Sequence, residues 1–174
     1  MKKYQIIYAD PPWKYSFSKT NNRKIENQYP TMNQKELCAL DIPSDDNAAL
    51  YLWATAPKLI EALEVMNAWG FSYKTNAVWD KKKIGMGYWF RGQHELLLVG
   101  TKGKFSPPTQ KDRTSSVFEF PRGIHSKKPD EIRNLIKKWF PDLQRVELFC
   151  RFPSDGWDVW GNEIEPTAQI NYKS

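Results

Sequence analysis

Apolar residues recur along the chain with the lengths and spacings of strands and helices. Continuous apolar stretches at 48–53 and 145–150 are typical of strands that are covered on both faces. The segments 4–9, 73–79 and 95–101 also favour strands. The two segments 80–93 and 102–116 are expected to form long loops, because glycine, proline and charged residues interrupt any regular pattern there.

Residues at helical spacing separate these predicted strands. One helix is expected to begin near Pro57 and to end before Gly70, with apolar positions at Leu59, Ile60, Leu63 and Met66. A second helix is expected to begin at Pro129, with one face formed by Ile132, Leu135, Ile136 and Trp139. Asn33 and Glu36 have the spacing of a capping box, which predicts a short helix through Leu40.

Alternation of strands and helices predicts an α/β fold with a mostly parallel sheet and helices on both faces. Sheets of this kind bind ligands at the carboxyl ends of their strands. The chain contains no internal repeat, low-complexity tract or linker, so residues 1–174 are expected to form a single domain.

Composition narrows the class of protein. Hydrophobic residues make up 40% of the 174 residues and charged residues 26%, which is typical of a globular domain. The apolar runs are all shorter than the roughly 20 residues that a bilayer span needs, and the N-terminal run is too short for a signal peptide. Two cysteines, Cys38 and Cys150, are too few for a disulfide scaffold or a cysteine-rich zinc site. A cytoplasmic protein without a metal site and without membrane contact is therefore expected.

The balance of charge and aromatic residues suggests a polyanionic partner. The net charge is +6 at pH 7, and 14% of the residues are aromatic. Basic residues attract phosphates, and aromatic side chains stack on bases. Nucleic acid is therefore the expected partner.

The tetrapeptide Asp10-Pro11-Pro12-Trp13 directly follows the first predicted strand. Its prolines fix the backbone, so their carbonyl oxygens are held rigidly as acceptors. The Asp10 carboxylate and the Pro11 carbonyl could each accept one hydrogen of an exocyclic amino group, while the Trp13 ring covers the base. Two such acceptors would localise the nitrogen lone pair for attack on an electrophilic methyl group. A simple turn at the end of a strand is the alternative.

The same tetrapeptide resembles the catalytic motif of the adenine-N6 methyltransferases that include the catalytic subunit of the eukaryotic messenger-RNA adenosine methyltransferase. The chain is similar to small bacterial and phage members of that family. Further segments match in family order over residues 5 to 164, at 29–32, 50–53, 87–91, 94–95, 98–100, 125–132, 147–151 and 156–163.

This resemblance implies a Rossmann-like fold and methyl transfer from S-adenosylmethionine to the N6 amino group of adenine in a nucleic acid. It implies catalytic roles for Asp10, Pro11, Pro12 and Trp13, and an acceptor-base pocket lined by Tyr29 and Glu95. It also implies that the cofactor is held by Asp10, Lys128, Arg151, Ser154, Asn162 and Glu163. At Ser154 the chain departs from relatives that carry His-Asn there, which puts that contact in doubt.

The C-terminal tail, about 165–174, offers a second departure. Long relatives have an Asp-Ile pair upstream of the catalytic motif that contacts the cofactor adenine, whereas only nine residues precede Asp10 here. Residues 167–172 alternate like a short strand, so Gln169 and Ile170 are hypothesised to replace that pair. A frayed terminus is the alternative.

The loop at 80–93 mixes basic and aromatic residues, which suits contact with a nucleic-acid strand. The residues expected to contact the substrate are Lys81, Lys82, Lys83, Trp89 and Arg91. A solvated charged surface is the alternative. Because the target adenine must reach Asp10, the substrate is expected to be single-stranded or to have its base flipped out of a duplex.

The sequence therefore predicts an adenine-N6 methyltransferase, with DNA the favoured substrate because the chain lacks the extra regions of RNA-modifying relatives. An RNA adenine methyltransferase, a catalytically silent nucleic-acid-binding subunit and a protein-amide methyltransferase remain alternatives. The intact Asp10 argues against the silent subunit. A homo- or hetero-oligomer is compatible with the sequence.

Overall fold

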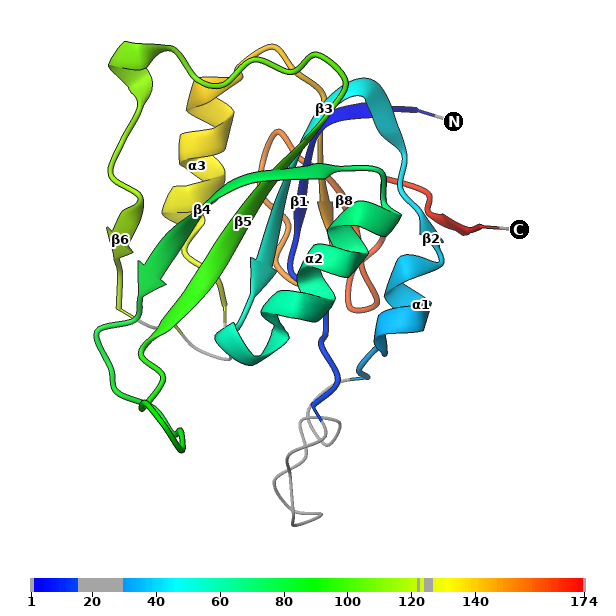
Figure 1. Ribbon diagram of the computed structural model, residues 1–174. Coiled ribbons are helices and arrows are strands. Elements are labelled where there is room, and N and C mark those ends of the chain that lie inside the picture. Colours follow the sequence, from blue (N-terminus) through cyan, green and yellow to red (C-terminus); the bar gives the residue numbers. More distant parts are fainter. Residues whose placement is uncertain (1, 16–29, 122, 124–126, 174) are drawn as a thin grey trace.

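A seven-stranded β-sheet forms the centre of the protein (Figure 1). The computed structural model describes residues 2–15, 30–121, 123 and 127–173. Across the sheet the strands follow the order β6 (Val117–Glu119), β4 (Ser72–Asp80), β5 (His94–Lys102), β3 (Ser44–Ala54), β1 (Tyr4–Ala9), β7 (Arg145–Leu148) and β8 (Asp158–Trp160). Strand β5 runs antiparallel to both neighbours, while the other pairs in this sheet are parallel. The predicted mostly parallel α/β sheet is thus confirmed.

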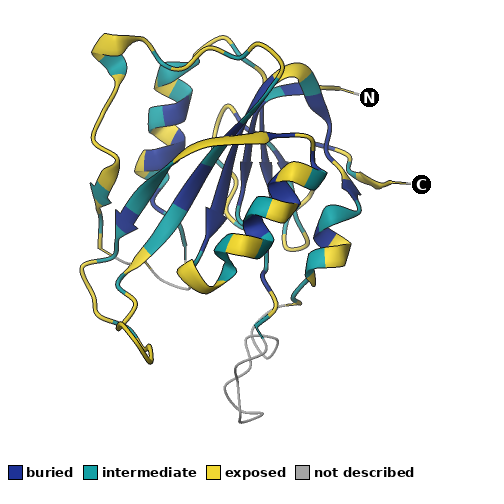
Figure 2. Ribbon diagram, in the orientation of Figure 1, coloured by how far each residue is buried: buried dark blue, intermediate teal, exposed yellow. Residues whose placement is uncertain are grey.

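Helices cover both faces of this sheet, as predicted. The helices α1 (Gln34–Cys38) and α2 (Leu59–Ala68) pack on one face, and α3 (Asp130–Trp139) packs on the other (Figure 1). Alternate residues of β1 point to opposite faces, so Ile7 joins the core under α2 while Ile6 and Tyr8 join the core under α3. Figure 2 shows the central strands as the most buried part of the fold.

The first helix begins as its sequence predicts. The Glu36 N–H donates to Asn33 Oδ1 over 3.0 Å, and the Asn33 N–H donates to Glu36 Oε2 over 2.6 Å, which completes the capping box. The helix ends at Cys38 rather than Leu40, because Leu40 begins β2 (Leu40–Asp41). This short strand pairs antiparallel with β9 (Asn171–Tyr172) in a separate two-stranded sheet.

Helix α2 buries most of the predicted stripe, because Met66 is buried and Leu59 and Leu63 pack partly buried against the core. Its buried residues are Ala62, Val65 and Met66, while Ile60 is 71% exposed. The prediction for Ile60 was wrong, because 3.6 residues per turn place Ile60 on the side of the helix opposite the buried Ala62 and Val65. The predicted end is confirmed, since Gly70 follows the helix with a φ of 85°.

Several strands extend beyond the apolar pattern or lack one. Strand β3 begins at Ser44, before the apolar run, because its first residue pairs with Tyr4 of β1. Strands β6 and β8 have three residues each, which is too short for a periodic signal. The loop predicted at 102–116 contains a 3-10 turn at Gln110–Asp112.

Among the described residues, no helix combines the length and the apolar composition that crossing a membrane requires.

Candidate active site

The carboxyl ends of β1, β3, β7 and β8 surround a pocket of about 360 Å³. Parallel strands bring their carboxyl ends to one edge of the sheet, which is where α/β folds bind ligands. The pocket is lined by residues that the sequence analysis singled out, namely Asp10, Pro11, Pro12, Trp13, Glu95, Lys128, Arg151, Asn162 and Glu163.

The turn after β1 is held by hydrogen bonds on both sides. The Pro11 carbonyl accepts the Trp13 N–H over 2.8 Å, and the Pro12 carbonyl accepts the Met32 N–H over 2.9 Å. The Trp13 indole donates to the Trp53 carbonyl over 3.1 Å, which fixes the buried ring against β3. Each proline carbonyl keeps one lone pair, so the turn retains acceptor capacity toward a ligand.

Four side chains of alternating charge form a series of ion pairs that begins in the pocket lining and ends at Lys81. Lys128 Nζ lies 2.8 Å from Asp10 Oδ2 and 3.3 Å from Glu95 Oε2. The other oxygen of Glu95 lies 3.3 Å from Lys81 Nζ. The side chains of Lys128 and Glu95 are only 11% and 14% exposed, so water screens these contacts less than it would on the surface.

Burial and ion pairing shift the pKa values of Asp10 and Lys128 in opposite directions. Burial raises the pKa of the Asp10 carboxyl, and the nearby Lys128 ammonium counteracts this shift. Burial also disfavours the Lys128 ammonium, but attraction to Asp10 and Glu95 outweighs it and holds the pKa of Lys128 above its ordinary value. Lys128 therefore stays charged at neutral pH and favours the ionised form of Asp10.

Two aromatic side chains, Trp53 and Tyr8, help to position Lys128. The Lys128 ammonium lies 5.7 Å from the ring centroid of Trp53, within the range of a cation–π contact. The Trp53 indole donates to the buried Tyr8 hydroxyl over 2.6 Å, which orients the ring. Burial raises the pKa of Tyr8, so this hydroxyl stays neutral.

The far wall of the pocket contains strained and closely packed backbone. Phe149 follows β7 with a φ of 62°, a conformation that non-glycine residues adopt rarely and at a cost of about 1–3 kcal/mol. Its ring meets that of Trp160 edge-on at 5.3 Å. A Cβ atom at Gly161 would lie 2.2 Å from the Cys150 carbonyl oxygen, so only glycine fits there. Asn162 and Glu163 directly follow Gly161, so this wall places both polar residues in the pocket lining.

Comparison with known proteins now settles the family, because the MT-A70 family model matches residues 4–163. The chain belongs to the MT-A70 family. It is 39% identical to a Mycoplasma protein described as type II methyltransferase M.MunI, over 94% of this chain and 78% of that protein.

Eukaryotic members are more distant and much longer. The chain is 29% identical to human N(6)-adenosine-methyltransferase catalytic subunit METTL3, over 94% of this chain but only 28% of that protein. It is also 29% identical to a Drosophila melanogaster N(6)-adenosine-methyltransferase MT-A70-like protein, of which it spans 27%. The predictions of an adenine-N6 methyltransferase of this family and of its α/β fold are confirmed.

MT-A70 membership implies S-adenosylmethionine as methyl donor, and the pocket offers groups of matching chemistry. Paired charges at Asp10 and Lys128 suit an amino-acid moiety, and Asn162 and Glu163 suit a ribose diol. The rings of Phe149 and Trp160 offer apolar surface for a purine. The described residues contain no group of three or more His, Cys, Asp or Glu side chains that could hold a metal ion.

Three residues expected to bind the cofactor, Ser154 from the family and Gln169 and Ile170 from the tail hypothesis, lie away from this MT-A70 pocket. The Ser154 carbonyl accepts the Trp157 N–H outside the lining, and Gln169 is exposed. Ile170 packs against the hydrophobic core instead. The tail does form the short strand β9, but Tyr172 is its residue that lines the pocket. Tyr29 lies outside the described residues.

The basic residues of the 80–93 loop differ in their partners. Lys81 pairs with Glu95, and Lys82 lies 2.5 Å from a Glu119 oxygen. Lys83 is exposed and forms no ion pair with the described part of the chain. The Arg91 side chain donates through Nε to the Gly85 carbonyl over 3.0 Å. Only Lys83 among the three lysines is thus available for phosphate without breaking a pair.

Sequence reasoning missed several lining residues of the MT-A70 pocket. The Tyr15 and Thr55 hydroxyls are 2.7 Å apart and close one side. The turn that contains Thr55 follows β3 and was already expected near the site as a strand end, so only Tyr15 of this pair was missed. Phe149, Trp160 and Tyr172 carried no such signal, because their contribution depends on backbone conformation and on contacts made far along the chain.

Proposed function

We propose that this chain transfers a methyl group from S-adenosylmethionine to the N6 amino group of adenine in DNA. The observation that carries the proposal is the Asp10 carboxylate, which stands beside two rigid proline carbonyls and is held by Lys128 inside the pocket. Family membership supports the reaction class, and the greater similarity to a type II methyltransferase favours DNA over RNA.

Asp10 and Pro11 would each accept one hydrogen of the adenine amino group. The Pro11 carbonyl has a lone pair left after accepting the Trp13 N–H, and the Asp10 carboxylate has an oxygen besides the one that Lys128 contacts. Two acceptors on one amino group direct the nitrogen lone pair away from them. The proton released after transfer goes to Asp10 or to water.

The pocket residues named above would hold the cofactor, which supplies an electrophilic methyl group on a sulfonium when bound. Lys128 would bind the carboxylate of its amino-acid moiety. The Glu163 carboxylate would accept hydrogen bonds from the ribose hydroxyls, and the Asn162 amide could donate or accept them. Lys128 also keeps Asp10 ionised, which is the form that accepts hydrogens.

The acceptor adenine must leave a duplex to reach Asp10, because the carboxylate lies at the base of a pocket rather than on the surface. Glu95 contributes to the same pocket and faces the base in this proposal. We propose that residues 1–174 act as one catalytic unit, and that the enzyme works in the cytoplasm where DNA and S-adenosylmethionine meet.

Transfer of labelled methyl groups tests the function directly. The purified chain is incubated with labelled S-adenosylmethionine and DNA, RNA or a mixture of proteins, and the modified base is identified after hydrolysis. The proposal expects N6-methyladenine in DNA at a higher rate than in RNA. Preferential labelling of RNA would replace DNA by RNA as the substrate, and labelling of protein alone would overturn the proposal.

A further inference from the structure

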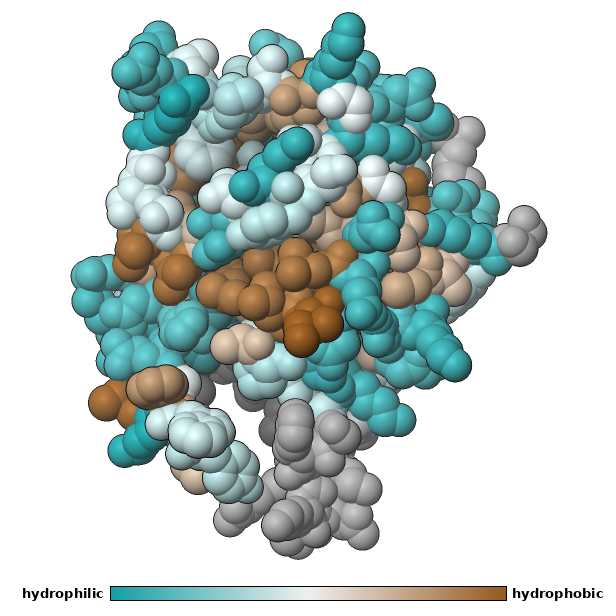
Figure 3. Space-filling view, in the orientation of Figure 1, coloured by the Kyte–Doolittle hydropathy of each residue, from teal (hydrophilic) through white to brown (hydrophobic). Residues whose placement is uncertain are grey.

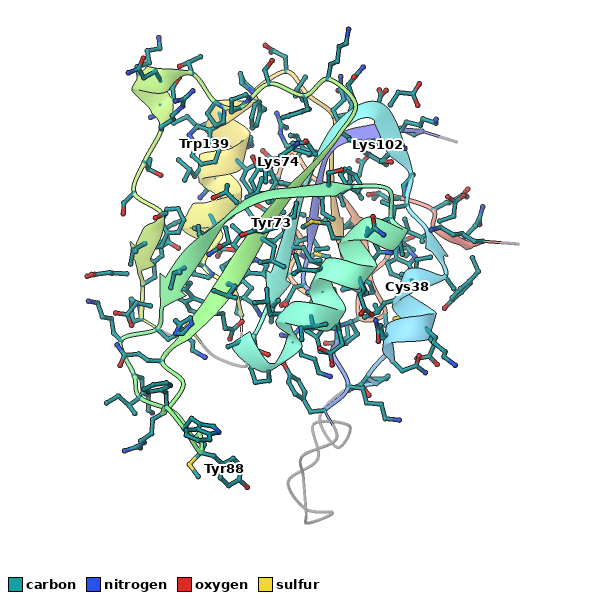
Figure 4. All side chains as sticks on the ribbon, in the orientation of Figure 1. Cys38, Tyr73, Lys74, Tyr88, Lys102 and Trp139 are labelled. Carbon is teal, nitrogen blue, oxygen red and sulfur yellow. The ribbon has the colours of Figure 1, made fainter. Side chains whose placement is uncertain are left out.

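The loop between β4 and β5 displays a cluster of large apolar side chains in solvent. Tyr88 is 96% exposed, Trp89 is 95% exposed and Phe90 is 91% exposed. We call Tyr88, Trp89 and Phe90 the aromatic tip. Figure 4 shows Tyr88 at the far end of the loop, and Figure 3 shows the loop standing away from the body of the protein. An apolar cluster of this kind usually marks a surface that a partner covers.

The loop is a defined hairpin and its tip is tightly turned. The Gly85 N–H donates to the Gly92 carbonyl over 2.8 Å, and the Gly92 N–H donates to the Met86 carbonyl over 3.0 Å. A Cβ atom at Gly87 would lie 1.9 Å from the Phe90 carbonyl oxygen, so the turn requires glycine. The backbone is thus shaped to present the aromatic tip outward.

The base of this hairpin is part of the active site. Trp79 of β4 pairs with Glu95 of β5, and Glu95 lines the catalytic pocket. Lys81 joins the hairpin base to the same carboxylate through its ion pair. The hairpin therefore projects beyond the same edge of the sheet at which Asp10 lies (Figure 1).

We propose that the aromatic tip is a wedge that inserts into the base stack of duplex DNA beside the target adenine. This inference rests on the proposed function. An adenine can enter the pocket only after leaving its stack, and apolar side chains that enter a base step lower the cost of that unstacking. The tip takes the place of the departed base, while the pocket binds the base itself.

Charge around the tip favours a nucleic acid over a protein as the occupant. Exposed Lys83 lies on the same hairpin, as does Arg91, and the whole chain carries a net charge of +6. Aromatic residues beside cations suit a stacked polyanion, since rings stack on bases while cations bind phosphates. A second copy of this basic chain would bring like charges together at the tip.

A comparison of native and heat-denatured plasmid DNA tests the wedge. The variant Tyr88→Ala/Trp89→Ala/Phe90→Ala removes the aromatic tip. Tyr73→Ala is the matched control, because Tyr73 is an exposed aromatic near the opposite end of β4 (Figure 4).

Methyl transfer to both DNA forms is measured for the three proteins. The variant is expected to lose about tenfold or more on native duplex, in line with the strength of aromatic–base stacking. It should keep its rate within about twofold on denatured DNA, where no base pair has to open and the base leaves its neighbours at the lowest cost.

The possible results separate the wedge from the underlying activity. An equal loss on both DNA forms, or no loss on either, would overturn the wedge. Wild-type activity on single strands alone would also overturn it and leave the methyltransferase proposal standing. An unmodified protein that methylates neither form would refute both. Light scattering on the same samples completes the test, since a dimer that the variant converts to a monomer would identify the tip as a protein interface.

Discussion

Lys128 Nζ lies 2.8 Å from Asp10 Oδ2, although 118 positions separate the two residues in the chain. Asp10 follows β1, and Lys128 precedes α3 on the opposite face of the sheet from α2. The fold therefore brings a cation from a loop to a carboxylate at a strand end. Burial of the pair makes the ionisation of each group depend on the other.

Removing Lys128 should change the pH dependence of catalysis. Asp10 accepts hydrogens only when ionised, and burial already raises its pKa, so activity falls as pH drops through that raised value. Lys128→Met removes the cation that opposes this shift. The acidic limb of the pH profile of kcat/KM is therefore expected to move to higher pH.

Lys127→Met is the control for this measurement, because Lys127 is the neighbouring lysine but forms its ion pair with Asp130 rather than with Asp10. Its profile should follow that of the unmodified protein. An acidic limb that stays in place in Lys128→Met would show that Lys128 does not govern the ionisation of Asp10.

The lysines of the β4–β5 loop should differ in their contribution to binding. Each phosphate contact contributes about 0.9 to the slope of log affinity against log salt on duplex DNA. Lys83→Ala should lower that slope by about this amount, because Lys83 has no ion pair within the described residues. Lys82→Ala should lower it less, since Lys82 is paired with Glu119. Equal slopes for Lys83→Ala and the unmodified protein would remove Lys83 from the interface.

Local patterns along the chain predicted much of this architecture. The capping box at Asn33, the apolar runs of β1 and β3, and the polar residues after strand ends all depend on neighbours in sequence. The Asp10 motif was identifiable because its carboxylate, its two proline carbonyls and its indole ring lie within four consecutive residues. Placing Glu95 and Lys128 beside it required the family resemblance, since no local pattern links them.

Other features depend on contacts that a local pattern does not encode. Pairing of β9 with β2 brings the exposed Tyr172 to the edge of the pocket lining, whereas alternation along the tail drew attention to Gln169 and Ile170. The strained φ of Phe149 arises where β7 meets the pocket wall. Ile60 is apolar but exposed, because it lies on the side of α2 opposite the buried Ala62 and Val65.

The tail should affect cofactor binding through Tyr172. Tyr172→Ala is expected to weaken S-adenosylmethionine binding by about three- to tenfold, the range of a lost aromatic contact. Gln169→Ala and the control Asn171→Ala should bind as the unmodified protein does. Point changes are preferable to truncation, because Ala168 is buried and the Thr167 hydroxyl accepts the Val159 N–H. Calorimetric titration measures S-adenosylmethionine binding by the three variants. Weaker binding by Gln169→Ala would instead support the hypothesis that Gln169 and Ile170 contact the cofactor.

In the proposed mechanism, Asp10 accepts a hydrogen from the target amino group. Removing one such transition-state contact typically lowers the rate by about 10²–10³. The protein should remain folded after this change, because Lys128 keeps Glu95 as an ion-pair partner when Asp10 is removed. Asp155→Ala is the control, since it removes a fully exposed carboxylate.

Methyl transfer to adenine-containing DNA by Asp10→Ala, measured beside its thermal unfolding, is the decisive test of this role. We expect Asp10→Ala to be folded and to have lost at least about 10² in turnover, while Asp155→Ala remains fully active. A folded Asp10→Ala protein with near-normal turnover would show that Asp10 takes no part in the transfer and would leave Asp10-Pro11-Pro12-Trp13 as a structural turn.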